Sequence, residues 1–82
     1  MDAAPEMADK ILDATGLKCP LPVLRTRKAL KDVPVGGMLE VLATDPASVM
    51  DIGVFCGQTG HELVAQSQDG DVFTFLIRRA SA

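Results

Sequence analysis

The chain has 82 residues, of which 48% are apolar, but its only aromatic residues are three Phe. This length fits one domain with an aliphatic core, and the composition excludes both intrinsic disorder and a second domain. The formal net charge of −3 lacks the basic excess of nucleic-acid-binding domains. We therefore expect protein partners and no direct contact with nucleic acid.

The N-terminal residues 1–9, "MDAAPEMAD", predict a flexible tail ahead of a single domain over 10–82. Acidic residues stand where a secretory signal would have a basic start and an apolar run. No apolar stretch approaches the length of a membrane span. We expect a cytoplasmic protein that does not contact a membrane.

The first half of the domain predicts a strand, a helix and a second strand. "KILD", residues 10–13, is a short apolar strand that ends at a turn containing Gly16. Helix formers run from residue 20 to about 31, and Pro34 with the glycine pair at 36–37 stops the helix. Apolar and β-branched residues in 38–44 predict the second strand.

The second half predicts a helix followed by a hairpin. Asp45 and Pro46 have the residue types of an N-cap and a first helical position, and "GQTG" ends this helix. Strands are expected over 61–67 and 71–79, joined at Asp69–Gly70. The order βαβαββ indicates an α/β (α+β) two-layer sandwich, in which two helices pack on one face of a mixed four-stranded sheet.

The two cysteines fit neither a disulfide framework nor a metal site, because the single His61 does not complete four ligands. We expect two free thiols, no metal and no cofactor. Cys56 shares a helical face with Val49, Ile52 and Phe55, which favours a place in the core over a role as a resolving thiol. His61 is expected to cap a strand start rather than to catalyse.

Cys19 precedes two prolines in the segment "CPLP" and is the candidate nucleophile. With Cys19 as the N-cap, Pro20 and Pro22 fit the first helical turn, since proline has a helical φ and lacks an N–H that would be unpaired there. The positive end of the helix would lower the pKa of the thiol. The residues expected to stabilise the thiolate are Lys18 and, through their backbone N–H groups, Leu21 and Val23.

The competing interpretation is that Cys19 is a small apolar side chain of the core. No CxxC motif and no local His or Asp supplies a partner for multistep catalysis. The residues alone leave both possibilities open, and they favour a thiol that accepts a group over a stand-alone enzyme.

The segments "LDATGLKCPLPVLRTRKAL" and "ATDPASVMDIGVFCGQTGHEL" resemble the TusA-like sulfur-carrier family, which includes SirA-, YedF- and YeeD-type proteins. The similarity runs from about Leu12 to Arg79. The resemblance implies a βαβαββ fold and a persulfide on the cysteine of a Cys-Pro-x-Pro motif, which is Cys19 here. It also implies a sulfur donor, such as a cysteine desulfurase or a rhodanese-type enzyme, and a sulfur acceptor. The family serves tRNA thiolation, molybdenum cofactor supply and sulfur-oxidation relays.

The first predicted helix carries a basic stretch that is either a solvated face or a docking surface for an acidic partner. Helical spacing places two leucines on the same side as Lys28. The candidate docking residues are Leu21, Leu24, Arg25, Arg27, Lys28 and Lys31. A protein of another class remains as the alternative, namely a non-catalytic interaction or redox-regulatory module in which Cys19 is structural or sensing.

Overall fold

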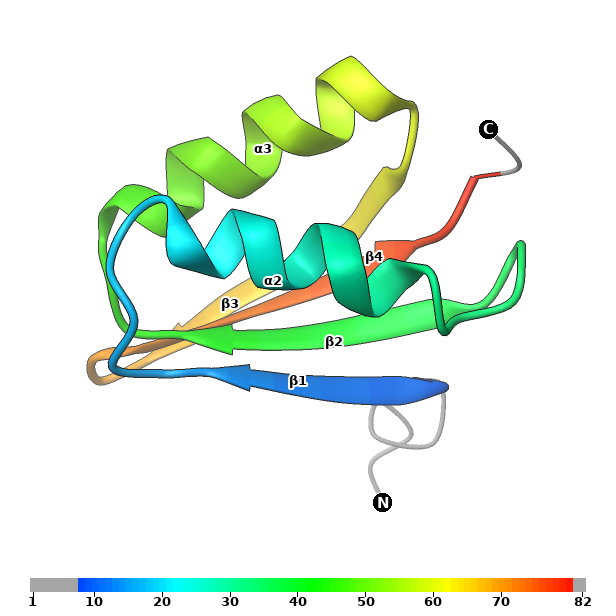
Figure 1. Ribbon diagram of the computed structural model, residues 1–82. Coiled ribbons are helices and arrows are strands. Elements are labelled where there is room, and N and C mark those ends of the chain that lie inside the picture. Colours follow the sequence, from blue (N-terminus) through cyan, green and yellow to red (C-terminus); the bar gives the residue numbers. More distant parts are fainter. Residues whose placement is uncertain (1–7, 81–82) are drawn as a thin grey trace.

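Six helices and strands succeed one another in residues 8–80, the part of the chain that the computed structural model describes (Figure 1). The order is strand, helix, strand, helix, strand, strand, which confirms the prediction. Their bounds are β1 Lys10–Ala14, α2 Leu21–Leu30, β2 Met38–Ala43, α3 Ala47–Thr59, β3 Glu62–Asp69 and β4 Val72–Arg78.

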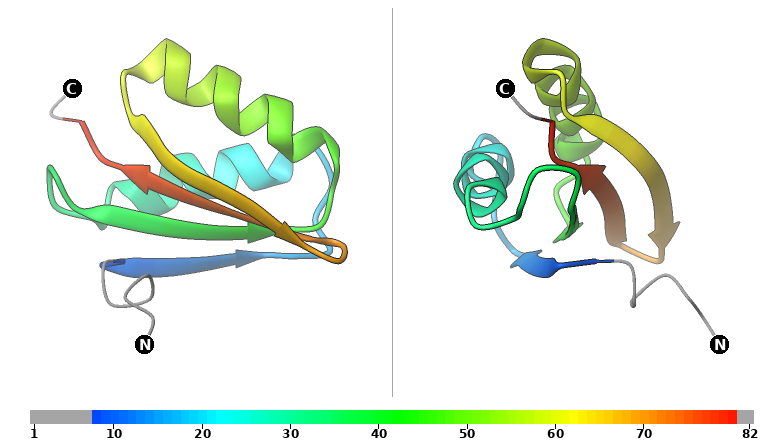
Figure 2. Two further views of the ribbon diagram at one scale, coloured as in Figure 1. Left: turned by 180° about the vertical axis from the view of Figure 1, so that it is seen from behind. Right: turned by 90° about the vertical axis from the view of Figure 1, so that its right-hand side faces the viewer.

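The four strands form one mixed sheet in the order β1-β2-β4-β3. β1 and β2 are parallel, whereas β4 pairs antiparallel with both β2 and β3. Helices α2 and α3 lie side by side on the same face of the sheet (Figures 1 and 2). The predicted two-layer arrangement of helices over a mixed sheet is therefore confirmed.

The core lies between the two layers and is aliphatic apart from two phenylalanines. Val41 at the centre of the sheet pairs with Leu12 of β1 and Phe75 of β4. Alternate residues of β2 and β4 point to the helices, as the period of two in a strand requires. The buried apolar residues at the centre are Leu39, Val41, Ala43, Ile52, Phe55, Phe75 and Ile77.

Glycines with positive φ end α3 and turn the hairpin. Gly60 at the end of α3 has a φ of 87°, and its N–H donates to the carbonyl of Cys56. The hairpin loop is Gly70–Asp71, one residue later than expected, because Asp69 still pairs with Val72. Gly70 has a φ of 62°, which suits the first position of a type II′ turn.

Residues 1–7 of the predicted tail lie outside the described residues. Asp9, which we also assigned to the tail, is bound to the start of β2. Its N–H donates to the carbonyl of Met38 at 2.8 Å, and its Oδ2 accepts the Met38 N–H at 2.8 Å. The domain therefore includes Asp9. No helix within residues 8–80 has the length and apolar character to cross a bilayer.

Candidate functional site

Two loops meet at one edge of the sheet because the parallel strands β1 and β2 end there. The first loop, 15–20, leads to α2, and the second, 44–46, leads to α3. The Gly16 N–H donates to Thr44 Oγ1 at 2.9 Å, and the Cys19 N–H donates to Asp45 Oδ2 at 2.6 Å. These two bonds fix the cysteine loop against the start of α3.

Cys19 lies just outside α2 rather than at its N-cap. The helix begins at Leu21 and Pro20 is the capping residue, so the predicted start at residue 20 is one position early. The Leu21 N–H donates to the carbonyl of Lys18 at 2.8 Å and is not available to the thiol. The Cys19–Pro20 peptide bond is cis. Pro22 is in the first turn, as expected, and is buried.

The partner of the Cys19 thiol is a carboxylate from α3. Cys19 Sγ donates to Asp51 Oδ2 at 2.7 Å, and Asp51 is half-buried. This hydrogen bond is the main reason that the pKa of Cys19 is raised, and desolvation and the negative charges of Asp51 and Asp45 raise it further. The expected lowering of the pKa at an electropositive helix start is therefore wrong. The thiol is exposed, and its raised pKa favours the protonated form.

Asp45 is held as a carboxylate by the same loop. Hydrogen bonds from the backbone N–H groups of Cys19 and Ala47 lower the pKa of Asp45, and the charge of Lys18 contributes to this lowering. Lys18 therefore stabilises Asp45, whereas we expected it to stabilise the thiolate. The Asp45 carboxylate accepts the Ala47 N–H at 3.1 Å. Because α3 begins at Ala47 and Pro46 is its N-cap, the predicted cap at Asp45 and first helical position at Pro46 are each one residue early.

A groove of about 260 Å³ runs between α2 and α3, with Cys19 and Asp51 among its lining residues. Apolar side chains from both helices form much of its wall, including those of Val23 and Met50. The Met50 side chain is 73% exposed and that of Val54, which also lines the groove, is 50% exposed. Exposed apolar side chains beside a reactive thiol offer contact area to a partner.

The six candidate docking residues are all exposed, but they face different neighbours. Leu21 and Leu24 are 41% and 52% exposed, as expected for a contact face, and Arg25 and Lys28 are exposed on the same helix. Arg27 instead turns toward α3, where its guanidinium lies 5.3 Å from the ring centre of Phe55. Lys31 lines a second cavity at the far end of α2.

Cys56 lies in the core as predicted, with 5% of its surface exposed, and burial raises the pKa of its thiol. Both cysteines are free thiols. Cys19 is therefore the accessible one of the two. Among residues 8–80, no group of three or more His, Cys, Asp or Glu side chains is placed to hold a metal ion.

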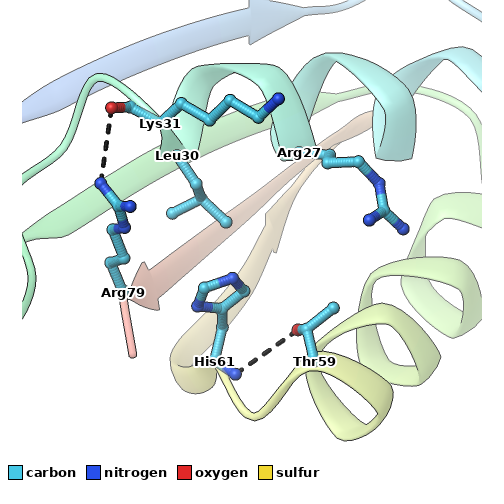
Figure 3. A pocket seen from close by; sticks show the side chains of 6 residues that line it. All are labelled: Arg27, Leu30, Lys31, Thr59, His61 and Arg79. Atoms are coloured by element: carbon cyan, nitrogen blue, oxygen red, sulfur yellow. Dashed lines mark hydrogen bonds between the residues drawn. The ribbon is translucent and has the colours of Figure 1, made fainter. Parts of the chain in front are cut away.

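His61 lies one residue before β3 and contacts the chain's C-terminal segment. Its Nδ1 accepts the Ala80 N–H at 2.9 Å, and its ring centre is 5.7 Å from that of Phe55. Burial, and then the charges of Arg79 and Arg27, lower the pKa of His61. The residue therefore ties the segment after β4 to the start of β3, as a structural histidine would. Figure 3 shows its backbone N–H donating to Thr59 Oγ1.

Sequence reasoning missed the two carboxylates that govern Cys19. We assigned Asp45 only as a helix cap and gave Asp51 no role in the site. The parallel pairing of β1 and β2 is a usable signal for Asp45, because the loops after parallel strands meet at one edge. The position of Asp51 beside Cys19 depends on which face α3 turns toward the sheet, and no local sequence pattern predicts that orientation.

The fold and the site define a class, namely a small two-layer α+β domain that presents one exposed thiol at the edge of a helical groove. Residues 10–79 match the family described as sulfurtransferase TusA, so the chain belongs to that family. Sulfur carrier protein TusA of Allochromatium vinosum is 49% identical over 72 residues, which cover 88% of this chain and 95% of that protein. The protein of the same name from Pseudomonas syringae pv. tomato is 47% identical over 73 residues, covering 89% and 87%.

Two further comparisons extend this relationship. A putative sulfur carrier protein of Neisseria meningitidis is 49% identical over 72 residues, which cover 88% of this chain and 97% of that protein. The crystal structure of a SirA-like protein from Desulfitobacterium hafniense matches with a TM-score of 0.75 at 27% identity. The match covers 88% of this chain and 99% of that one.

Proposed function

We propose that this protein is a sulfur carrier that accepts sulfane sulfur as a persulfide on Cys19 and passes it to an acceptor protein. The observation that carries the proposal is the exposed Cys19 thiol hydrogen-bonded to Asp51 at the end of an apolar groove. Membership of the TusA family and relatives named as sulfur carriers support it. The chemistry requires no cofactor beyond the transferred sulfur atom.

In the loading step, Cys19 attacks the outer sulfur of a donor persulfide. A new S–S bond forms on Cys19 while the donor's S–S bond breaks, and the donor leaves as a thiolate. Asp51, at 2.7 Å from Sγ, receives the thiol proton and returns it to that leaving thiolate. The sum of the step is one persulfide and one thiol on each side, so no oxidant or reductant is consumed. Unloading to an acceptor thiol is the reverse exchange.

The partner that loads Cys19 has to offset the effect of two nearby carboxylates on the pKa of the Cys19 thiol. Asp45 and Asp51 both raise the pKa of Cys19, so a thiolate forms more readily when a partner brings a positive charge close to them. Met50 and Val54 supply apolar contact beside the thiol. We therefore expect the donor, of the cysteine desulfurase or rhodanese type, to present a basic group next to its own reactive sulfur.

The redox-sensing alternative receives less support. Cysteines that sense oxidants combine exposure with a lowered pKa, since the thiolate is the species that reacts. Cys19 is exposed, but hydrogen bonding to Asp51 raises its pKa. In the free protein, Cys19 is therefore protected from indiscriminate oxidation, which suits a carrier that reacts only with its partners.

The proposal is tested by following sulfur through both steps. The protein is loaded with a cysteine desulfurase and cysteine, separated from the donor, and mixed with a low-molecular-weight thiol, and released sulfide is measured. Wild type and Cys56→Ser should load and release sulfur equally, whereas Cys19→Ser should do neither. Sulfide release that survives Cys19→Ser, or that depends on Cys56, would exclude Cys19 as the carrier residue.

A further inference from the structure

A second cavity, of about 330 Å³, lies away from Cys19 between the end of α2, the end of α3 and the residue that follows β4 (Figure 3). Its volume falls within the range of small-ligand sites in proteins, which are about 300–1,000 Å³. Side chains from three separate segments of the chain line it: Arg27, Leu30, Lys31, Thr59, His61 and Arg79. None of these residues is acidic.

Three permanent positive charges surround this cavity in a protein whose formal net charge is −3. The ion pairs found among residues 8–80 are Lys10–Asp32 and Arg78–Glu62, and neither includes a cation of the cavity. Like charges held close together repel one another, so their clustering costs stability. Such a concentration of one charge in a concave site attracts a ligand of the opposite charge.

Several of the polar groups are held in place before any ligand arrives. The guanidinium of Arg79 donates to the carbonyls of Val33 at 2.6 Å and Lys31 at 3.4 Å. Because His61 Nδ1 accepts the Ala80 N–H, the neutral ring carries its proton on Nε2 and retains that donor. Burial, and then the charges of Arg79 and Arg27, lower the pKa of His61, so the ring favours its neutral form.

The donors around the cavity match the chemistry of a phosphate group. Arginine guanidinium groups bind phosphate through paired N–H donors, and lysine adds a point charge. A monocarboxylate offers one charge to three cations, whereas a phosphate monoester offers up to two. Leu30 adds an apolar wall that can cover part of an organic group.

We propose that the cavity formed by Arg27, Lys31, His61 and Arg79 is a binding site for a small ligand that carries a phosphate group. The site is distinct from the sulfur-carrying Cys19, and the proposal goes beyond the sulfur-carrier function. Arg27 lines both this cavity and the Cys19 groove, so the ligand lies next to the surface that partners use.

The test is an NMR titration of the full chain at constant ionic strength, with inorganic phosphate and with a ribonucleoside monophosphate as separate probes. We expect saturable shifts centred on His61 and Lys31, with a Kd of about 1 mM or tighter for at least one probe. The pKa of His61 should rise when the anion is bound, because a nearby negative charge favours the imidazolium.

Two substitutions that each remove one positive charge distinguish a specific binding site from a general effect of net charge. Lys31→Met should weaken binding about tenfold, whereas Lys28→Met, an exposed position of the same helix outside the cavity, should change the Kd less than about twofold. Sulfur loading of Cys19 is measured separately on the wild type, so failure of this proposal is distinguishable from failure of the carrier function.

Three results would overturn the proposal. The first is shifts that do not saturate with either probe, and the second is equal weakening by Lys31→Met and Lys28→Met. The third comes from a parallel titration with a single-stranded RNA oligonucleotide under the same conditions. Binding of the oligonucleotide with no binding of phosphate or the nucleotide would assign the cavity to a nucleic-acid backbone instead of a small ligand.

Discussion

Truncation of Ile52 tests whether α3, and with it Asp51, is positioned by packing on the sheet. Ile52 is fully buried and follows directly after Asp51 in the sequence. Deleting a buried isoleucine side chain to alanine costs about 2–5 kcal/mol, because the removed carbons lose their burial and leave a cavity. For a site with no exposed surface we expect about 3 kcal/mol, and for Ile52→Val about 1 kcal/mol.

These losses are large for a domain of this length. Native domains are stable by about 0.05–0.15 kcal/mol per residue, which gives roughly 4–12 kcal/mol for 82 residues. At about 4–8 °C per kcal/mol, Ile52→Ala should lower the Tm by roughly 12–24 °C. The assay is urea and thermal unfolding followed by circular dichroism.

Met50→Ala is the matched control, because Met50 is in the same helix and its side chain is 73% exposed. Its unfolding free energy should lie within about 0.5 kcal/mol of wild type. If Ile52→Ala cost less than about 1 kcal/mol, or no more than Met50→Ala, α3 would not be docked through Ile52. The placement of Asp51 beside Cys19 would then lose its structural basis.

Three further predictions concern the glycines and the two carboxylates. Gly37→Ala should destabilise the protein by about 1–3 kcal/mol in urea unfolding, since a Cβ there would lie 2.7 Å from a carboxylate oxygen. Gly53 lies in α3 with open space around it, so Gly53→Ala should stabilise the protein by about 0.5–1 kcal/mol. Unfolding free energies that change in the same direction for Gly37→Ala and Gly53→Ala would contradict the packing. Asp51→Asn should lower the pKa of Cys19, because it removes the negatively charged acceptor that raises that pKa. The pH profile of thiol alkylation should therefore move to lower pH. An unchanged profile would refute the contact between Cys19 and Asp51. The pKa of Asp45 is lower in the folded state than in the unfolded state, so ionised Asp45 stabilises the fold. This stabilisation is present above the pKa of the unfolded state and is lost as pH falls through the pKa of the folded state. Between about pH 6 and about pH 3, the urea midpoint of wild type should therefore fall more than that of Asp45→Asn, and parallel curves would contradict this.

Local sequence patterns were sufficient to predict the fold. Proline and glycine mark the ends of the helices, and alternation in β4 places Phe75 and Ile77 on the buried side. The errors were confined to element ends, where α2 begins at Leu21 and the hairpin turns at Gly70–Asp71. Ends are set by individual hydrogen bonds, which residue patterns do not determine.

Which of the two cysteines is exposed was predictable from the sequence, whereas the electrostatics around Cys19 were not. Cys19 is the exposed cysteine and Cys56 the buried one, as helical periodicity and the proline segment indicate. The direction of the pKa shift of Cys19 depends on Asp45 and Asp51, which are 26 and 32 positions away along the chain. Contacts at that separation arise from the topology of the sheet and the rotation of α3.

All six candidate docking residues are exposed, and their binding of a partner stays a prediction. A basic stretch on one helix predicts a continuous face only if the whole helix is exposed, but α2 packs against both the sheet and α3. Arg27 is drawn to Phe55 of α3, whereas Arg25 and Lys28 face outward. Two of the predicted cations, Arg27 and Lys31, line the second cavity.

Mass spectrometry of the intact protein is the most direct test of the central claim that Cys19 carries sulfur. The reduced protein is incubated with a persulfide-generating donor, beside Cys19→Ala and Cys56→Ala. We predict that wild type and Cys56→Ala each gain the mass of one sulfur atom, that a reductant removes it, and that Cys19→Ala gains nothing. Sulfur uptake by Cys19→Ala, or the absence of uptake by wild type, would contradict the account.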